Sequence, residues 1–288
     1  MVDTIQLLPI RTGSSGNCSI ITDGETTLLL DAGLPYKWIL KGLELLKLTP
    51  GQIDGILISH DHIDHIRGLP VLVKNLNTPI YTGQGTVDSF LSSPTSDNRW
   101  DKIVNQCIVI EPRDRERIHT FEMIAFDTHH DSMDSLGFTI TNNDEVALAF
   151  ITDTGKATLD MKRFCTNADL LFVESNHDVD MLLASDRPPL LKKRIRATHL
   201  SNSQTLTLIK ELQGRKTKGV VLNHLSEECN SPNKLQSTVL KAHTKYPQFH
   251  KLRWFVSPRY YFSEHLAISP SQIEKKSKYG WEMPFQSK

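Results

Sequence analysis

The stretch Ser59-His60-Asp61-His62-Ile63-Asp64-His65 places three imidazoles and two carboxylates within seven residues. It directly follows Gly55-Ile56-Leu57-Ile58, an apolar run that predicts a short buried strand. On an extended segment His60 and His62 point to the same side and can bind one metal ion together. The Asp64-His65 pair follows a turn and can face a second ion. The stretch therefore predicts a metal site at the end of a strand.

The ligand types in this cluster indicate which metals it suits. Neutral imidazole and carboxylate oxygen suit zinc, manganese or iron(II), whereas calcium prefers shells made of oxygen alone. A histidine-rich surface loop is the alternative, but so many potential ligands after a buried strand serve no packing purpose. We therefore expect two divalent metal ions as cofactors, with zinc as the first choice and manganese or iron as the alternatives.

The composition is that of an ordinary globular protein of 288 residues, with 39% hydrophobic and 23% charged residues. Basic and acidic residues number 33 each, so no global positive field indicates a nucleic-acid partner. The four cysteines form no Cys-x-x-Cys pair, which favours a reducing compartment. No signal peptide or membrane span is evident, and we expect a cytoplasmic protein with no membrane partner. The sequence leaves the oligomeric state open.

The order of apolar runs and turns predicts an α/β protein. Residues 5–10, 18–22 and 26–30 look like antiparallel strands, and strands broken by helices then follow in two rounds that each end in histidines. This pattern favours an αββα sandwich, in which two mixed sheets pack face to face between outer helices. We expect one such domain over 1–256 and a partly flexible surface appendage over 257–288. One strand is expected over 117–126, while 92–105 cannot be assigned.

A two-metal site needs more ligands than the first cluster supplies, so the ends of later strands should contribute them. His129-His130-Asp131 follows a predicted strand that ends near residue 126. Asp153 follows the apolar run 146–151, and His224 follows the run 219–222. Each group stands at the C-terminal end of a buried strand, as the first cluster does. We therefore expect these three strand ends to complete the site.

His60-x-His62-x-Asp64-His65 is similar to the signature of the metallo-β-lactamase-fold hydrolases, a superfamily of binuclear metal enzymes. The resemblance independently implies the αββα sandwich. It also implies a set of metal ligands, in which His60, His62 and His130 hold one ion, Asp64, His65 and His224 hold the other, and Asp153 bridges them.

Two positions near this set leave alternatives open. His129 competes with His130 as a ligand. His130 is preferred because His130-Asp131-Ser132 resembles a His-Asp-Ala segment of the YycJ/WalJ-type metallohydrolases, a subfamily to which further stretches are similar. The resemblance places Asp31 behind a metal ligand, where it would orient a histidine through the free ring nitrogen. A turn-forming aspartate before Ala32-Gly33 explains that residue nearly as well.

Further stretches resemble the YycJ/WalJ-type metallohydrolases, and the matches run from about residue 12 to residue 232. They are Gly13-Ser14-Ser15-Gly16-Asn17-Cys18, Glu174-Ser175-Asn176-His177-Asp178, Thr198-His199-Leu200-Ser201-Asn202 and His224-Leu225-Ser226-Glu227. The family is associated with exonuclease activity on DNA. The sequence departs from its pattern at Lys156, Thr198 and Cys229, none of which is an expected metal ligand.

This resemblance implies a binuclear-metal phosphodiesterase, and we expect a DNA 5′-exonuclease with nucleic acid as substrate. The alternative is a small-molecule hydrolase for a cyclic phosphodiester, a thioester or a lactone. Asp64 should be indispensable, and His177 or His199 could protonate the leaving oxygen. Substrate contacts are expected from two groups of residues, namely Asn176, Asp178, Ser201 and Asn202, and the basic run Lys192, Lys193, Arg194 and Arg196. Such a run is often only a solvated face.

Overall fold

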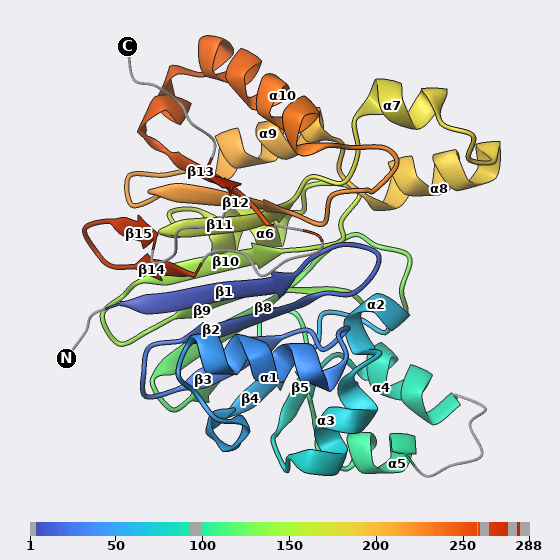
Figure 1. Cartoon of the computed structure of the whole chain (residues 1–288), viewed down its shortest axis with the longest axis vertical. Helices are drawn as coiled ribbons and strands as arrows, with labels where there is room; N and C mark the ends of the chain where they lie inside the picture. Colours follow the sequence, from blue (N-terminus) through green and yellow to red (C-terminus); the bar gives the residue numbers. More distant parts are fainter. Residues whose placement is uncertain (1–3, 93–98, 258, 260–264, 276–280, 283–288) are drawn as a thin grey trace.

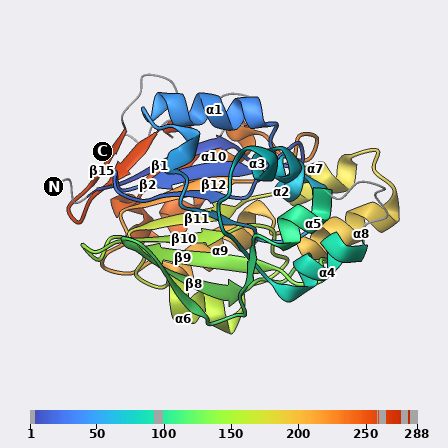
Figure 2. The ribbon, with the colours of Figure 1, turned by 90° about the horizontal axis from the view of Figure 1, so that it is seen from below.

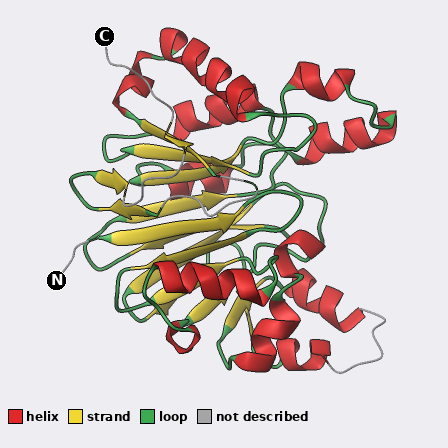
Figure 3. Cartoon of the chain, in the orientation of Figure 1, coloured by secondary structure: helices red, strands yellow, loops and turns green. Residues whose placement is uncertain are grey.

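The structure is a computed structural model, and it describes residues 4–92, 99–257, 259, 265–275 and 281–282. Two eight-stranded sheets pack face to face, and helices cover their outer faces (Figure 1, Figure 3). Figure 2 shows the four layers, with α1 on one side of the two sheets and α6 on the other. The αββα sandwich with two mixed sheets, predicted from the sequence, is confirmed.

The first sheet holds the N-terminal part of the chain. Its first three strands in sequence pair antiparallel and the next three pair parallel to one another, so the predicted antiparallel opening is confirmed. In spatial order the strands are β15 (Ile273–Lys275), β14 (Leu266–Ile268), β1 (Ile5–Arg11), β2 (Cys18–Thr22), β3 (Thr27–Leu30), β4 (Gly55–Leu57), β5 (Ile80–Thr82) and β6 (Cys107–Val109).

The second sheet is built from the later part of the chain. Three strand pairs in its middle are parallel, and the strands before them form an antiparallel meander. In spatial order the strands are β16 (Trp281–Glu282), β13 (Arg253–Val256), β12 (Gly219–Asn223), β11 (Leu170–Glu174), β10 (Ala147–Ile151), β9 (Leu136–Thr141), β8 (Phe121–Asp127) and β7 (Arg115–Ile118).

The helices lie between these strands in the chain. They are α1 (Tyr36–Leu45), α2 (Ile63–Ile66), α3 (Leu69–Asn75), α4 (Gln84–Ser92), α5 (Arg99–Val104), α6 (Leu159–Cys165), α7 (Val179–Ala184), α8 (Pro189–Thr198), α9 (Asn202–Leu212) and α10 (Pro232–Lys245), with short helical turns η1 (Pro50–Gln52) and η2 (Pro247–Lys251). No helix within the described ranges is long and apolar enough to cross a membrane.

The strands are apolar on both faces because each sheet is covered twice. Leu7 and Phe150 belong to the core between the two sheets, while Ile20 packs with Ile39 and Leu43 of α1 on the outer face of the first sheet. Burial of one such aliphatic or aromatic side chain contributes about 1.5–3 kcal/mol to folding. Continuous apolar runs in the sequence are the expected result of double coverage.

The structure differs from the sequence-based expectation in three segments. The single strand expected over 117–126 is the hairpin β7–β8, which turns at His119, a residue with φ of 48°. The run 92–105 contains α5, and its residues 93–98 lie outside the described ones. The basic run 192–196 lies in α8, a segment for which no helix was expected, and α8 has no buried residue.

The described part of 257–288 differs from the surface appendage that the sequence predicts. β14 pairs with β1 in the first sheet, and β16 pairs with β13 in the second. Leu266 and Ile268 are buried in the core between the sheets. An apolar triplet is too short to show a period, so the sequence pattern does not reveal such an edge strand. The flexibility expected there concerns residues that lie in part outside the described ones, and it stays a prediction.

Candidate metal centre

The candidate site lies at one edge of the sandwich, where strand ends of both sheets meet. In the first sheet the parallel strands β3 and β4 lead to Asp31 and to the loop that carries His60. In the second sheet β8 and β10 both run antiparallel to β9, and β12 runs parallel to β10 through β11. Their ends lead to His130, Asp153 and His224. Because parallel strands end at the same edge of a sheet, these loops converge.

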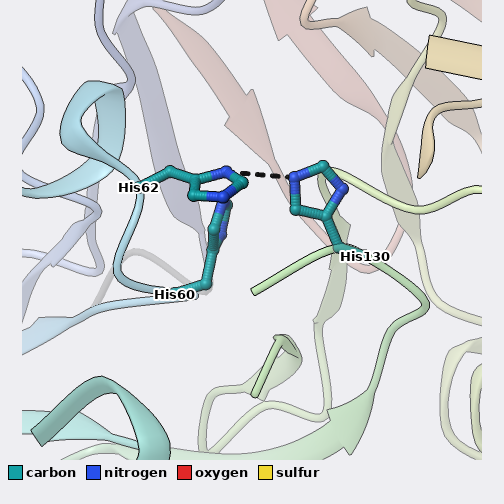
Figure 4. Close-up of side chains that lie close together, drawn as sticks. All are labelled: His60, His62 and His130. Carbon is teal, nitrogen blue, oxygen red and sulfur yellow. Dashed lines mark hydrogen bonds between the residues drawn. The ribbon is translucent and has the colours of Figure 1, made fainter. Parts of the chain in front are cut away.

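Three histidines form the first group of possible ligands. His60, His62 and His130 each offer a ring nitrogen, and these atoms lie within 4.8 Å of one another. Figure 4 shows the three rings facing one another, with His130 Nε2 3.2 Å from His62 Nδ1. His129 is exposed, and its carbonyl accepts a hydrogen bond of 2.7 Å from Gly155 N. The geometry therefore brings His130, and not His129, into the group.

A second group lies beside the first and contains two carboxylates and two imidazoles. Its members are Asp64, His65, Asp153 and His224, again within 4.8 Å. Asp153 Oδ1 is 2.7 Å from His224 Nδ1, and its Oδ2 is 3.3 Å from His65 Nε2. The same Oδ2 lies 3.7 Å from Nε2 of both His60 and His130. Asp153 thus stands between the two groups, where a bridging ligand would have to stand.

The protonation states of His60 and Asp153 favour metal binding. Burial, aided by the neighbouring His65, holds the pKa of His60 well below its usual value, so its ring is neutral. Burial alone would raise the pKa of Asp153, but His224 and His65 outweigh it and hold that pKa well below the usual range. A neutral imidazole and an ionised carboxylate are the forms that bind a divalent metal.

The hydrogen bonds of three histidines leave the Nε2 of each directed into the site. Nδ1 of His60 is 2.9 Å from Ser59 Oγ, Nδ1 of His65 is 2.7 Å from Asp31, and Nδ1 of His130 is 2.8 Å from the Thr198 carbonyl. Nε2 of His60 is buried and has no hydrogen-bond partner among the described residues. Since a buried polar atom is normally paired, this arrangement fits a bound metal ion.

Three residues at the site have a left-handed backbone. Asp31, Asp153 and His224 have φ of 56°, 42° and 51°. Asp31 and His224 directly follow buried strands, and Asp153 stands two residues after the end of β10. Side chains other than glycine rarely adopt this conformation, and its cost of about 1–3 kcal/mol is typical of functional sites. The surrounding packing therefore keeps Asp153 and His224 turned toward each other, and Asp31 turned toward His65, at the expense of local backbone energy.

Asp31 supports the site from behind, as the resemblance implied. Its Oδ1 accepts hydrogen bonds from Ser59 N (2.9 Å) and Ser59 Oγ (3.0 Å), and its Oδ2 accepts from His65 Nδ1.

Asp31→Asn should weaken metal binding about 10–100-fold. An amide has only one accepting oxygen, so it cannot accept from Ser59 and also hold His65 in the same tautomer. Competition with a chelator measures this affinity. Asp54→Asn is the matched control, since Asp54 accepts Thr27 N at the other end of β3, and an equal loss in both variants would refute the role of Asp31.

His199, the residue that directly follows α8, faces the metal-binding groups. Its ring centre is 4.8 Å from that of His130 and 5.3 Å from that of His224. Its Nδ1 lies 2.9 Å from Oε2 of Glu174, a fully buried carboxylate at the end of β11. Burial lowers the pKa of His199, but the Glu174 carboxylate outweighs it and raises the pKa to about 9. Sequence reasoning assigned no role to Glu174, although its place at a strand end was the available signal.

His177 has a different environment from His199. It is buried, and its Nδ1 has no hydrogen-bond partner among the described residues. Burial, together with the nearby His199, lowers its pKa to about 4. His177 is therefore neutral at neutral pH and carries no readily available proton.

Four residues expected to contact substrate are committed to contacts within the chain. Ser201 caps α9 by accepting from Gln204 N, and Asp178 caps α7 by accepting from Met181 N. Asn176 Nδ2 donates to the His224 carbonyl at 3.3 Å. The buried Asn202 accepts hydrogen bonds from Ser175 Oγ and Asn230 Nδ2. The structure thus places these polar groups in helix caps and a buried network, and their contact with substrate stays a prediction.

The basic residues of α8 divide into two sets. Lys192 Nζ donates to the Leu183 carbonyl at 2.7 Å, and Arg194 Nε donates to Asp131, which follows the site residue His130. Lys193 and Arg196 are exposed. The ion pair of Arg194 and Asp131 therefore holds α8 against the edge that carries the candidate metal centre.

A two-sheet sandwich with a His-x-His-x-Asp-His cluster at its edge defines the metallo-β-lactamase fold class. The family model described as "Beta-lactamase superfamily domain" matches residues 26–224, and this chain belongs to that family.

Two curated relatives cover most of the chain. Exodeoxyribonuclease YycJ of Bacillus anthracis is 30% identical over 77% of this chain and 82% of its own length. Exodeoxyribonuclease WalJ of Streptococcus pneumoniae is 30% identical over 77% of this chain and 81% of its own length. The solved structure of YhfI from Bacillus subtilis, a metallo-β-lactamase fold protein, covers 90% of this chain and 98% of its own with a TM-score of 0.66 at 18% identity, which shows the shared fold. This chain is a metal-dependent hydrolase of the superfamily, whose fold implies divalent metal ions.

Proposed function

We propose that this hydrolase holds two divalent metal ions, zinc first, and degrades DNA from the 5′ end. The observation that carries the two-metal part is the position of Asp153, which has carboxylate oxygens within 3.7 Å of ligand nitrogens from both groups. Two metals that share a ligand are a recurrent device for phosphodiester cleavage. The likeness to two exodeoxyribonucleases over more than three quarters of the chain supports DNA as the substrate.

In the proposed mechanism the chain's residues hold the ions and move one proton. The first ion would be held by His60, His62 and His130, and the second by Asp64, His65 and His224, with Asp153 between them. When bound, two such ions activate water at neutral pH and neutralise charge that builds on a phosphate. Asp31 and Ser59 keep the histidine rings in the tautomer that directs a lone pair into the site.

His199 is our choice for the residue that protonates the leaving oxygen. The nearby Glu174 carboxylate favours its charged form, and its ring lies against His130 and His224. His177 lacks both features. A protonated imidazole oriented by a carboxylate is the usual form of such an acid.

The exposed cations of α8 extend the site toward a polyanion. Arg194 is fixed beside His130 through Asp131, and Lys193 and Arg196 are exposed on the same helix. Phosphate contacts of this kind position a nucleic-acid strand without reading its sequence. We propose that α8 contacts the backbone next to the cleaved bond.

The test combines metal analysis of the purified protein with degradation of end-labelled DNA and RNA. We expect two metal ions per chain and mononucleotides released from the 5′ end of DNA. Products from the 3′ end would contradict the polarity, and preferred cleavage of RNA would contradict the substrate. Turnover of a cyclic nucleotide or a thioester without turnover of nucleic acid would favour the small-molecule alternative.

Asp64→Ala should abolish hydrolysis of a generic phosphodiester while the protein stays folded, because the second metal would lose a carboxylate ligand. We expect a loss of at least about a thousandfold in kcat, as is common when a catalytic metal site is broken. Asp101→Ala is the matched control, since Asp101 also lies in the first turn of a helix but is exposed. Unchanged hydrolysis by the Asp64 variant would refute the mechanism.

A further inference from the structure

Three cations gather around one aromatic ring on the first helix. The side chains of Arg11, Lys37 and Lys41 lie 5.5 Å, 5.9 Å and 4.8 Å from the centre of the Trp38 ring. Lys37 and Lys41 are exposed, and Trp38 is half-buried. We call these four residues the Trp38 cluster.

The Trp38 cluster has an excess of positive charge. No carboxylate of the described residues forms an ion pair with Lys37 or Lys41, and the first turn of α1 contains no acidic residue. Like charges four residues apart on one helix face repel each other. The cation–π contacts with Trp38 offset part of this repulsion and keep the ammonium groups near one another. An anion that contacts several of these cations would remove the remaining repulsion between them.

The cluster stands next to the candidate metal centre. Arg11 ends β1 and directly precedes Thr12, whose Oγ1 accepts a hydrogen bond from the backbone N–H of His224. Trp38 lies in the first turn of α1, a short loop away from Asp31. The cluster therefore adjoins the His224 side of the site, whereas α8 adjoins the His130 side.

The two basic surfaces thus lie on opposite sides of the centre. Figure 1 shows α1 across the first sheet in the lower half of the molecule and α8 in the upper right, beyond the strand ends. A strand that passes over the metal-binding residues from α8 would continue toward α1. Its phosphates would meet positive charge on both sides of the cleaved bond.

We propose that the Trp38 cluster is a second binding surface for single-stranded DNA, which holds the part of the strand on the side of the centre away from α8. This inference rests on the proposed nuclease function and adds to it a contact outside the site of cleavage. Positive charges that follow the backbone, combined with aromatic side chains, are the usual means of holding a single strand without sequence preference, because phosphates and base faces recur along every strand. Cleavage of substrates too short to reach α1 should not depend on the Trp38 cluster.

The test compares two charge reversals of equal size. K37E/K41E removes the two exposed lysines of the cluster. K210E/K245E makes the same change around Tyr246, where Lys210 and Lys245 lie 5.2 Å and 5.3 Å from the ring centre. These two lysines lie near the C-terminal ends of α9 and α10, which start at the metal-bearing edge and run away from it. Each variant is assayed on long single-stranded DNA and on a dinucleotide at several salt concentrations.

We expect K37E/K41E to raise KM for long DNA about tenfold with kcat unchanged, and to leave the dinucleotide reaction unaffected. The slope of log affinity against log salt should become shallower by about 1.4, or about 0.7 for each phosphate of a single strand that the lysines no longer neutralise. K37R/K41R should keep the wild-type values. Equal behaviour of K37E/K41E and K210E/K245E on long DNA would overturn the inference while leaving the nuclease proposal intact. Failure of the wild-type protein to degrade DNA would overturn both.

Discussion

Asp153→Asn is expected to reduce phosphodiester hydrolysis by at least about a thousandfold, because Asp153 is the residue that both groups of ligands share. Its two oxygens lie 2.7 Å and 3.3 Å from nitrogens of His224 and His65. An amide keeps the shape of the side chain and tolerates the φ of 42° at this position, but it lacks the negative charge. The loss should therefore come from the metal centre and not from unfolding.

Metal content and kcat on a small phosphodiester measure this effect together. We expect the Asp153 variant to bind fewer than two metal ions per chain. Asp144→Asn is the control, since Asp144 is exposed in the turn before β10 whereas Asp153 follows the end of that strand. A variant with full metal content and wild-type kcat would show that Asp153 does not bridge the two ions.

Much of the fold can be predicted from the sequence because the strands are buried on both faces. The runs 28–30, 147–151 and 170–173, which make up most of β3, β10 and β11, are continuously apolar, and their length separates them from helices. Elements without such a pattern escaped prediction. α8 has no buried face, and β14 gains its place through pairing with β1, more than 250 residues earlier in the chain. Pairing between distant segments leaves no local signal.

The candidate ligands could be located for a related reason. Cations in α/β folds are held at the ends of strands, and His130, Asp153 and His224 each follow a predicted strand. The same reasoning could not separate ligands from structural polar residues. Ser201 and Asn202 also belong to a polar motif, but their side-chain oxygens accept hydrogen bonds from Gln204 N and Ser175 Oγ. The hydrogen-bond partner of a side-chain oxygen depends on the three-dimensional packing, which local sequence patterns do not reveal.

Glu174 shows the converse difficulty. It stands at the end of β11, in the middle of a parallel set, and is fully buried. Its Oε1 accepts from the backbone N–H groups of Thr154 and Leu200, and its Oε2 lies beside Nδ1 of His199. One carboxylate thus ties together the loops that follow β10 and α8. A buried carboxylate needs such partners, and they orient His199 toward the metal-binding residues.

His199→Ala should therefore lower kcat for DNA by about 10²–10⁴-fold, the usual contribution of a residue that donates a proton in the transition state. His177→Ala is the matched control, because His177 is another histidine near the site, but it is buried and neutral at neutral pH. We expect the His177 variant to retain most of its activity. Metal content should stay at the wild-type level in both variants.

The leaving group distinguishes proton donation from a structural effect. A nitrophenolate ion leaves without a proton, whereas the sugar oxygen of a nucleotide does not. If His199 is the acid, its loss should hardly change kcat for bis(p-nitrophenyl) phosphate but should strongly lower kcat for DNA. An equal loss on both substrates would instead mean that His199 acts by positioning the ligands, as its contacts with His130 and His224 would also allow. Glu174→Gln extends the test, because an amide has a single accepting oxygen, which the backbone N–H groups of Thr154 and Leu200 would occupy. The variant would then no longer stabilise the charge of His199, so it should reproduce part of the loss on DNA alone.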